Sequence, residues 1–151
     1  MCGGIGFKIS QFSKKYLREY FDERQIEAAR SLGELEVFYW SHRPVLPVQI
    51  DKKVKLIDWG NRDKNVKLPM TGWAKKESIN LGKWAYVKPI YVDILVTRGY
   101  EKGVWFELNK SIKGLLVTEK SKARVYMITA PASYEYQKLT GHNREPVLIN
   151  N

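Results

Sequence analysis

Short β-prone runs recur throughout this chain, whereas helix-forming sequence is confined to two stretches. Strands are predicted at 5–9, 35–40, 48–50, 54–59, 90–96, 104–108, 114–117, 124–129 and 147–149. Aromatic and β-branched residues are frequent in these runs, as is typical of strands. The strands do not alternate with helices, as they do in folds with a parallel sheet. The order of elements therefore predicts an α+β fold with a mostly antiparallel sheet.

The two helical stretches lie near the ends of the chain. The first is predicted over 13–32, where Ser13 can cap the helix and Gly33 can end it. Large side chains recur there at helical spacing, namely Tyr16, Leu17, Tyr20 and Phe21. The second is predicted over 133–140. We therefore expect an N-terminal helix and a short C-terminal helix beside the sheet.

Four connecting segments complete the predicted order. The segment 43–47 holds two prolines and is expected to be extended, and 51–53 is expected to turn. In the segment 61–83, apolar residues recur at neither helical nor strand spacing, so a long irregular surface segment is predicted. The segment 97–103, which includes Glu101, is predicted to be a turn between strands.

Length and composition indicate one globular domain that spans residues 1–151. Hydrophobic residues make up 44% of the chain and charged residues 28%, which are values typical of folded proteins. We find no internal repeat, low-complexity stretch or linker. A chain of this length is long enough to bury a single hydrophobic core.

The cysteine count and the hydropathy of the chain limit the cellular compartments in which we expect the protein. One cysteine excludes an internal disulfide and a cysteine-based zinc site. No run of about 18 apolar residues occurs, and the start of the chain lacks the features of a signal peptide. We therefore expect an intracellular monomer, in the cytoplasm or nucleoid and not secreted, with no membrane contact, metal or cofactor.

The lone cysteine, Cys2, directly follows the initiator methionine. A small second residue permits removal of Met1, and Cys2 would then carry an α-amine and a thiol on adjacent carbons. These groups titrate near ~7.7–8.0 and ~8.5, so both are partly reactive at neutral pH. Together they can condense with an aldehyde to form a thiazolidine. The alternative is that Cys2 is an inconsequential residue of a frayed terminus.

The charge of the chain favours a polyanionic partner. The formal net charge is +10 and the isoelectric point is about 9.6. The window 61–88 holds seven basic residues against two acidic ones, together with Trp73 and Trp84, and Trp59 lies just before it. Cations interleaved with aromatic rings suit single-stranded nucleic acid, although tryptophans are more often core residues.

Two further stretches contain side chains that could take part in chemistry. Glu101 lies near the end of the predicted turn 97–103, where its carboxylate could take part in catalysis or could be a solvated turn residue. His142 can shuttle protons near neutral pH, and Arg144 can reach a phosphate. Both could equally be ordinary loop residues. His42 has no acid or second histidine at ligand spacing and is expected to be structural.

The order of these segments resembles the SOS-response-associated peptidase family, known as the SRAP domain. The matching segments are Met1-Cys2-Gly3, Trp59-Gly60, 74–78, 94–101, 127–133 and 142–148. In the family they correspond to Met-Cys-Gly, Trp-Gly, Asn-Ala-Arg-x-Glu-Thr/Ser, a strand ending in Gly-Phe/Tyr-Tyr/Phe-Glu, Leu-Thr-x-x-Ala-Asn and His-x-Arg-Met-Pro-Val-Leu. The matches are loose, but they follow the family order over nearly the whole chain.

This resemblance implies a distorted β-barrel core and a covalent reaction with DNA. SRAP proteins crosslink to abasic sites in single-stranded DNA through an N-terminal cysteine. Cys2 is thereby implied to attack the C1′ aldehyde of the ring-opened deoxyribose, which would shield the lesion during the response to DNA damage. The resemblance implies that Glu101 is the general acid/base and that His142 protonates the sugar ring oxygen.

The resemblance also implies DNA contacts around the reacting sugar. Lys75 and Arg144 would hold flanking phosphates, which position a strand without reading its sequence. Trp59 or Trp73 would stack on the base beside the lesion, unless they belong to the core.

Four positions depart from the family pattern, so the chain resembles a compact, divergent member of the family. Gly4 stands where arginine is usual, and Trp73 stands in place of an asparagine. Lys75 replaces an arginine and so loses the bidentate fork, and Glu145 replaces a methionine.

Three other functions stay open from the sequence. The chain could be a cysteine autopeptidase, although only Met1 precedes Cys2. It could be a basic module that binds single-stranded DNA or RNA without covalent chemistry, or a small interaction domain. Loss of the Cys2 thiol separates these functions, because only covalent capture and peptide cleavage need it.

Overall fold

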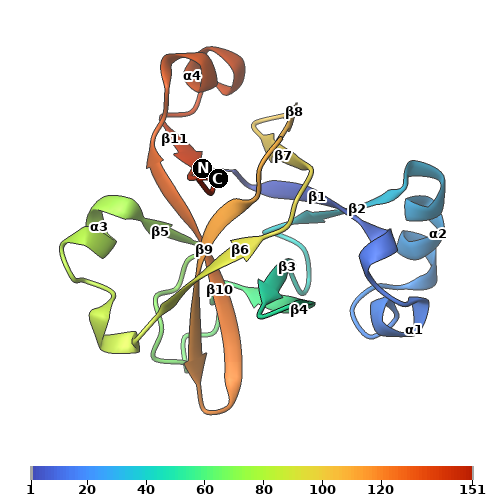
Figure 1. Cartoon of the computed structure of the whole chain (residues 1–151), viewed down its shortest axis with the longest axis horizontal. Helices are drawn as coiled ribbons and strands as arrows, with labels where there is room; N and C mark the ends of the chain where they lie inside the picture. The colour runs from blue at the N-terminus through green and yellow to red at the C-terminus, as the bar shows by residue number, and fades with distance from the viewer. Residues whose placement is uncertain (1, 151) are drawn as a thin grey trace.

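The computed structural model describes residues 2–150 of the chain (Figure 1). The strands are β1 (Gly4–Lys8), β2 (Glu34–Phe38), β3 (Val45–Ile50), β4 (Lys53–Trp59), β5 (Trp73–Lys75), β6 (Ile90–Ile94), β7 (Arg98–Glu101), β8 (Val104–Glu107), β9 (Ile112–Glu119), β10 (Lys122–Pro131) and β11 (Arg144–Pro146). The helices are α1 (Lys14–Leu17), α2 (Glu23–Leu32), α3 (Lys76–Asn80) and α4 (Tyr134–Thr140). The described residues therefore form an α+β domain in which strands predominate, as predicted.

A closed barrel forms the centre of the domain. Its strands follow the order β10–β4–β3–β6–β9, and the antiparallel pair of β9 and β10 closes the ring. All but one of these pairs are antiparallel, because β10 runs parallel to β4. The long strand β10 also carries β11 and the short parallel strand β5 (Figure 1). The barrel thus brings β5, β10 and β11 together at one edge.

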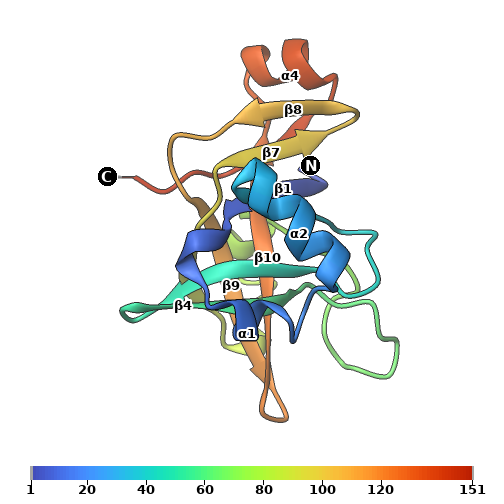
Figure 2. The same cartoon turned by 90° about the vertical axis from the view of Figure 1, so that its right-hand side faces the viewer.

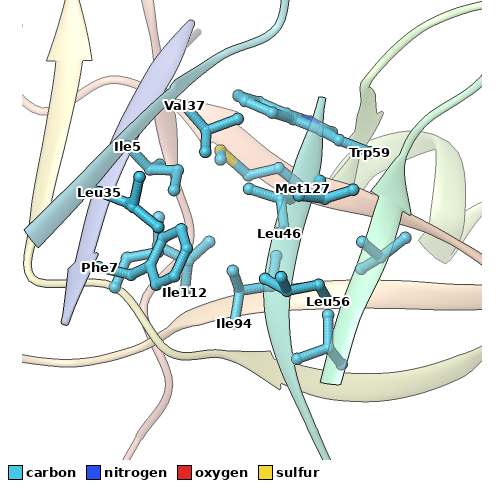
Figure 3. Close-up of a cluster of buried hydrophobic side chains, with 14 of the residues drawn as sticks. Ile5, Phe7, Leu35, Val37, Leu46, Leu56, Trp59, Ile94, Ile112 and Met127 are labelled. Carbon is cyan, nitrogen blue, oxygen red and sulfur yellow. The ribbon is translucent and has the colours of Figure 1, made fainter. Parts of the chain in front are cut away.

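A second sheet, with the order β2–β1–β7–β8, packs against the barrel. Its inner face contributes Ile5, Phe7 and Val37 to the core, where they meet barrel side chains such as Leu46 and Met127 (Figure 3). All five side chains are at most 3% exposed. Burial of these apolar side chains fixes the second sheet on the barrel.

The predicted N-terminal helix is divided in two. Ser13 caps α1 by accepting a hydrogen bond from the Tyr16 backbone, as predicted, but α1 ends at Leu17. Asp22 then opens α2 with a capping box, and Gly33 ends α2 in the left-handed conformation with φ 81°. The prediction of one helix over 13–32 was wrong because the Asp22 cap competes with continuation of the helix. Figure 2 shows α1 and α2 as separate segments.

Two predicted connections contain regular structure. The segment 61–83 includes β5 and α3, so it is not irregular throughout. The predicted turn 97–103 is largely strand β7, and the turn itself is confined to Lys102 and Gly103. Both short strands are held by pairing with distant strands, β5 with β10 and β7 with β1, which local sequence does not show.

The C-terminal elements match the prediction in part. Helix α4 begins after Ser133, which caps it, and ends at Gly141. The closing strand is β11, slightly earlier than the predicted 147–149, and Leu148 forms only an isolated bridge with Ile112. Among residues 2–150, no helix has both the length and the apolar character needed to cross a membrane.

We predict that Leu46→Ala lowers the free energy of unfolding by about 2–5 kcal/mol, because Leu46 is fully buried where the sheet meets the barrel. The matched control is Leu81→Ala, since Leu81 is 74% exposed and its truncation changes stability by no more than about 0.5 kcal/mol. Urea unfolding measures both variants. If Leu46→Ala lowered the free energy of unfolding by no more than Leu81→Ala does, the interface between the second sheet and the barrel would contribute little to stability.

Candidate functional site

The pairing of β1 with β7 brings the start of the chain to the end of β7. The Gly3 amide donates to the Tyr100 carbonyl at 2.9 Å, and Gly4 pairs with Tyr100. Both views place the first residues of β1 beside β7 (Figures 1 and 2). Cys2 therefore lies close to Glu101, although the two residues are 99 positions apart in the sequence.

The Cys2 side chain is fully buried. Its thiol donates to the Gly4 carbonyl at 3.0 Å, and the Cys2 carbonyl accepts a hydrogen bond from the Trp73 indole at 3.0 Å. Burial raises the pKa of the thiol to about 12, and the negative charge of Glu101 acts in the same direction. At neutral pH the group is therefore a protonated thiol and not a thiolate nucleophile.

Gly99 leaves the space that the thiol occupies. A Cβ at this position would lie 2.5 Å from the Phe106 ring and 3.1 Å from the Cys2 sulfur. Both distances are shorter than an ordinary contact, so any side chain here would displace the thiol or the ring. The glycine next to Tyr100 is thus a requirement of the site itself.

Glu101 is the last residue of β7 and is only 7% exposed. This burial excludes the solvated turn residue that the sequence left open. Its carboxylate faces His142, whose Nδ1 lies 3.9 Å from Glu101 Oε1. The separation is longer than a direct hydrogen bond, so a small group could bridge the two side chains.

The His142 ring is held by the backbone that follows it. Its Nδ1 accepts a hydrogen bond from the Arg144 amide at 3.1 Å. Burial lowers the pKa of His142 below its ordinary value, so the ring is neutral at neutral pH. Because Nδ1 is an acceptor, the proton of the neutral ring resides on Nε2. His142 therefore has an N–H donor on the side away from its backbone contact.

Arg144 is engaged with protein groups instead of projecting into solvent. Its guanidinium forms a bidentate ion pair with Glu77, at 2.6 and 3.1 Å. The same group donates to the Thr129 carbonyl at 2.9 Å and to its hydroxyl at 3.2 Å. Sequence reasoning missed this role of Glu77, although Glu77 lies within the segment 74–78 that resembles the SRAP family.

Lys75 remains available at the same edge of the barrel. It is exposed at the end of β5, where it pairs with Thr129 of β10. The structure therefore places Lys75 and Arg144 around one residue, Thr129, and leaves the lysine as the accessible cation of the two.

The tryptophans of the basic window are mainly structural. Trp59 is 2% exposed, and its indole donates to the Gly72 carbonyl at 3.0 Å. Trp84 is 8% exposed and packs against Tyr126. Burial places both residues in the core. Trp73 is half-buried, and its hydrogen bond to Cys2 makes it a support of the site.

Cys2, Glu101, His142 and Trp73 thus gather from four separate parts of the chain. Thiol, carboxylate and imidazole at one location can bind a carbonyl compound, move protons and expel water. Within residues 2–150, no group of three or more His, Cys, Asp or Glu side chains is arranged to hold a metal ion.

Comparison with known proteins gives the fold but no family. No protein family matches the chain, and no curated protein is similar to it in sequence. A solved structure of a protein from Bacteroides thetaiotaomicron is similar, with a TM-score of 0.60 and 14% identity. The match covers 97% of this chain and 77% of that one. At this identity the likeness establishes a shared fold alone.

We predict that Glu77→Gln removes part of the acid dependence of stability. Hydrogen bonding to Arg144 lowers the pKa of Glu77 from 4.5 to about 2. The ionised carboxylate therefore stabilises the fold fully above about pH 4.5 and loses this effect as the pH falls towards 2. Melting temperatures of the wild type and variant should differ above pH 5 and converge near pH 2.

The matched control is Glu27→Gln, because Glu27 forms a solvent-exposed pair with Arg30 at 3.1 Å. Its melting temperature should follow that of the wild type at every pH, since exposed pairs contribute little. A constant difference between wild type and Glu77→Gln from pH 7 to 2 would contradict the prediction.

Proposed function

We propose that this protein is a divergent SRAP protein that forms a covalent crosslink between Cys2 and an abasic site in single-stranded DNA. The observation that supports this most directly is the convergence of Cys2, Glu101 and His142. These are the three residues that the family resemblance implies for the reaction, and they come from distant segments. The net charge of +10 fits a nucleic-acid partner.

The surroundings of Cys2 favour a reaction that begins at nitrogen. Removal of Met1 creates the α-amine, which at an ordinary pKa near ~7.7–8.0 is partly unprotonated at neutral pH. The thiol, with a pKa raised to about 12, is a poor first nucleophile. The amine therefore attacks C1′ of the open-chain aldehyde, and loss of water gives an imine. The sulfur then bonds to C1′, its proton passes to the nitrogen, and the thiazolidine ring closes.

Glu101 and His142 assist different proton transfers in this sequence. The Glu101 carboxylate lies close enough to Cys2 to influence the thiol electrostatically. It can accept the proton that the attacking amine releases, deliver that proton to the departing hydroxyl, and then relay the thiol proton to the imine nitrogen. His142 presents Nε2–H, which can donate to the ring oxygen of the closed sugar and favour the aldehyde form. Burial of both groups strengthens these interactions.

The cations at the edge of β5 and β10 hold the strand. Lys75 is exposed there and contacts a flanking phosphate. Arg144 reaches a phosphate only by releasing Glu77, so its first role is to fix the backbone that orients His142. This division follows from the geometry of the two side chains around Thr129.

We predict that a strand with one abasic site gives an adduct that survives denaturing electrophoresis. Cys2→Ser retains the amine but not the sulfur, so it should form only an imine, which persists after borohydride reduction and hydrolyses without it. Intact mass spectrometry of the wild type should show loss of Met1 and gain of the DNA mass less one water.

Two outcomes would contradict the proposed function. A Cys2→Ser adduct as stable as that of the wild type would exclude the thiazolidine. Retention of Met1 in the purified, DNA-reactive protein would exclude the amine. If the wild type binds single strands but forms no adduct, the protein is a non-covalent binding module.

We predict that Glu101→Gln and His142→Ala slow the crosslink more than they change its final yield, because Cys2 supplies both bonding atoms. General acid/base assistance contributes about 10²–10⁴ in rate, and Glu101→Gln should lose an effect of this size. His142→Ala should slow both formation and reversal. Quenched time courses on denaturing gels measure the rates, and Glu135→Gln on α4 is the control. A wild-type rate for Glu101→Gln across pH 6–8 would exclude its role.

A further inference from the structure

The face of the second sheet that points away from the barrel carries a row of aromatic rings. Phe38, Gly4, Tyr100 and Trp105 are cross-strand neighbours on β2, β1, β7 and β8. Ring centroids of Phe38 and Tyr100 lie 5.3 Å apart, and those of Tyr100 and Trp105 lie 5.0 Å apart. Trp40 stacks on Phe38 at 4.8 Å with an interplanar angle of 21°. We call Phe38, Trp40, Tyr100 and Trp105 the aromatic platform.

The side chain at the end of the platform is exposed to solvent. Trp40 is 63% exposed, whereas the other three rings are half-buried. An indole that keeps most of its surface in water while stacked on a second ring offers an accessible π-face. Isolated exposed apolar residues are common, but Trp40 is backed by three connected rings that hold its exposed face in place.

The platform adjoins the reactive end of the chain. A Cβ at Gly3 would lie 3.4 Å from Trp40 Cζ3. A Cβ at Gly4 would lie 2.6 Å from the Phe38 ring and 3.1 Å from Tyr100 Cβ, so position 4 has no room for a side chain. Aromatic rings therefore occupy the volume that would be needed by an arginine at position 4, the residue that is usual there in SRAP proteins.

The segment that carries Trp40 is held in place by the backbone. The Tyr39 amide donates to the Gly3 carbonyl at 3.0 Å, which ties this segment to the residue after Cys2. The Arg62 guanidinium donates to the carbonyls of Tyr39 at 3.3 Å, Ser41 at 2.7 Å and His42 at 2.9 Å. Trp40 is thus preorganised, which lowers the entropy lost when a ligand stacks on it.

Charge on either side of the platform indicates how a nucleic-acid strand would run. Towards Trp105, Arg98 is paired with Glu34 and Glu36 at 2.7 and 2.8 Å, so its charge is already balanced. Beside the segment that carries Trp40, a cleft is lined by three arginines and two aspartates. Arg43 pairs with Asp58 at 3.2 Å, and the arginines outnumber the aspartates by one, so the cleft keeps a positive charge that includes Arg62. Phosphates are therefore favoured on the Arg62 side and disfavoured beside the two glutamates.

We propose that the aromatic platform binds an unpaired nucleobase of the DNA strand, stacked on Trp40 and adjacent to the nucleotide that reacts with Cys2. The strand continues from Cys2 past Trp40 towards Arg62. This inference rests on the proposed function, and it assigns base stacking to Trp40 in place of Trp59 or Trp73. Stacking accepts any base, so the platform gives affinity without sequence preference.

The test compares two short single strands that contain the non-reactive abasic analogue tetrahydrofuran, so that no crosslink can form. In one strand adenines flank the analogue, and in the other the flanking nucleotides are also tetrahydrofuran. Trp40→Ala should weaken binding of the adenine-flanked strand by about 5-fold to 100-fold. It should change binding of the strand without flanking bases by less than about 2-fold, and Trp40→Phe should restore most of the lost affinity.

The matched control is Tyr91→Ala. Tyr91 is also 63% exposed, and it has a cation beside its ring, since Lys113 Nζ lies 5.8 Å from the centroid. The Tyr91→Ala variant should bind both strands with the affinity of the wild type. Equal loss for both strands, no loss for Trp40→Ala, or an equal loss for Tyr91→Ala would overturn the proposal. A Trp40→Ala variant that loses only self-association in light scattering would overturn it as well.

The failure of this inference is distinguishable from failure of the crosslinking function. If the wild type crosslinks a true abasic site but Trp40→Ala does not discriminate between the tetrahydrofuran strands, the platform is not a base site and the chemistry stands. If discrimination is seen and the wild type forms no adduct, Trp40 stacks on a base in a protein that binds DNA without reacting.

Discussion

The pairing of β1 with β7 is the constraint on which the candidate site depends. A backbone hydrogen bond from the Gly3 amide to the Tyr100 carbonyl joins the two strands at this point. Cys2 precedes Gly3 and Glu101 follows Tyr100, so the bond brings Cys2 and Glu101 close together. The same pairing aligns Phe38, Gly4 and Tyr100 on the opposite face of the sheet. The site and the aromatic platform are therefore two consequences of one strand register.

Burial gives the site its chemical character. The thiol of Cys2 has its pKa raised and the imidazole of His142 has its pKa lowered, both mainly by desolvation. Each shift favours the neutral form of the group. A site of neutral donors around a buried carboxylate suits the condensation with a carbonyl that we propose, in which protons move and no stable ion needs to form. In that proposed reaction, attack by the amine before the thiol follows from the raised pKa of the thiol.

The glycines of this region permit the close packing that burial requires. Gly99 lies against the Cys2 sulfur and the Phe106 ring, and Gly4 lies against Phe38. A side chain at either position would separate β1 from the elements that cover it. The rings of the aromatic platform occupy the space in which any side chain at position 4 would begin.

The sequence by itself determined the class of fold, most of the strands, and the roles of Ser13 and Gly33 at helix ends, because hydrophobic periodicity, residue propensity and helix capping act over a few residues. It also singled out Cys2, Glu101 and His142, through the order of short segments. Only the tertiary structure decided that Glu101 is buried in a strand, that Arg144 is held by Glu77, and that Trp59 is core while Trp40 is exposed. Strand pairing and burial are set by residues far apart in the chain, and no local pattern records which of two tryptophans another sheet will cover.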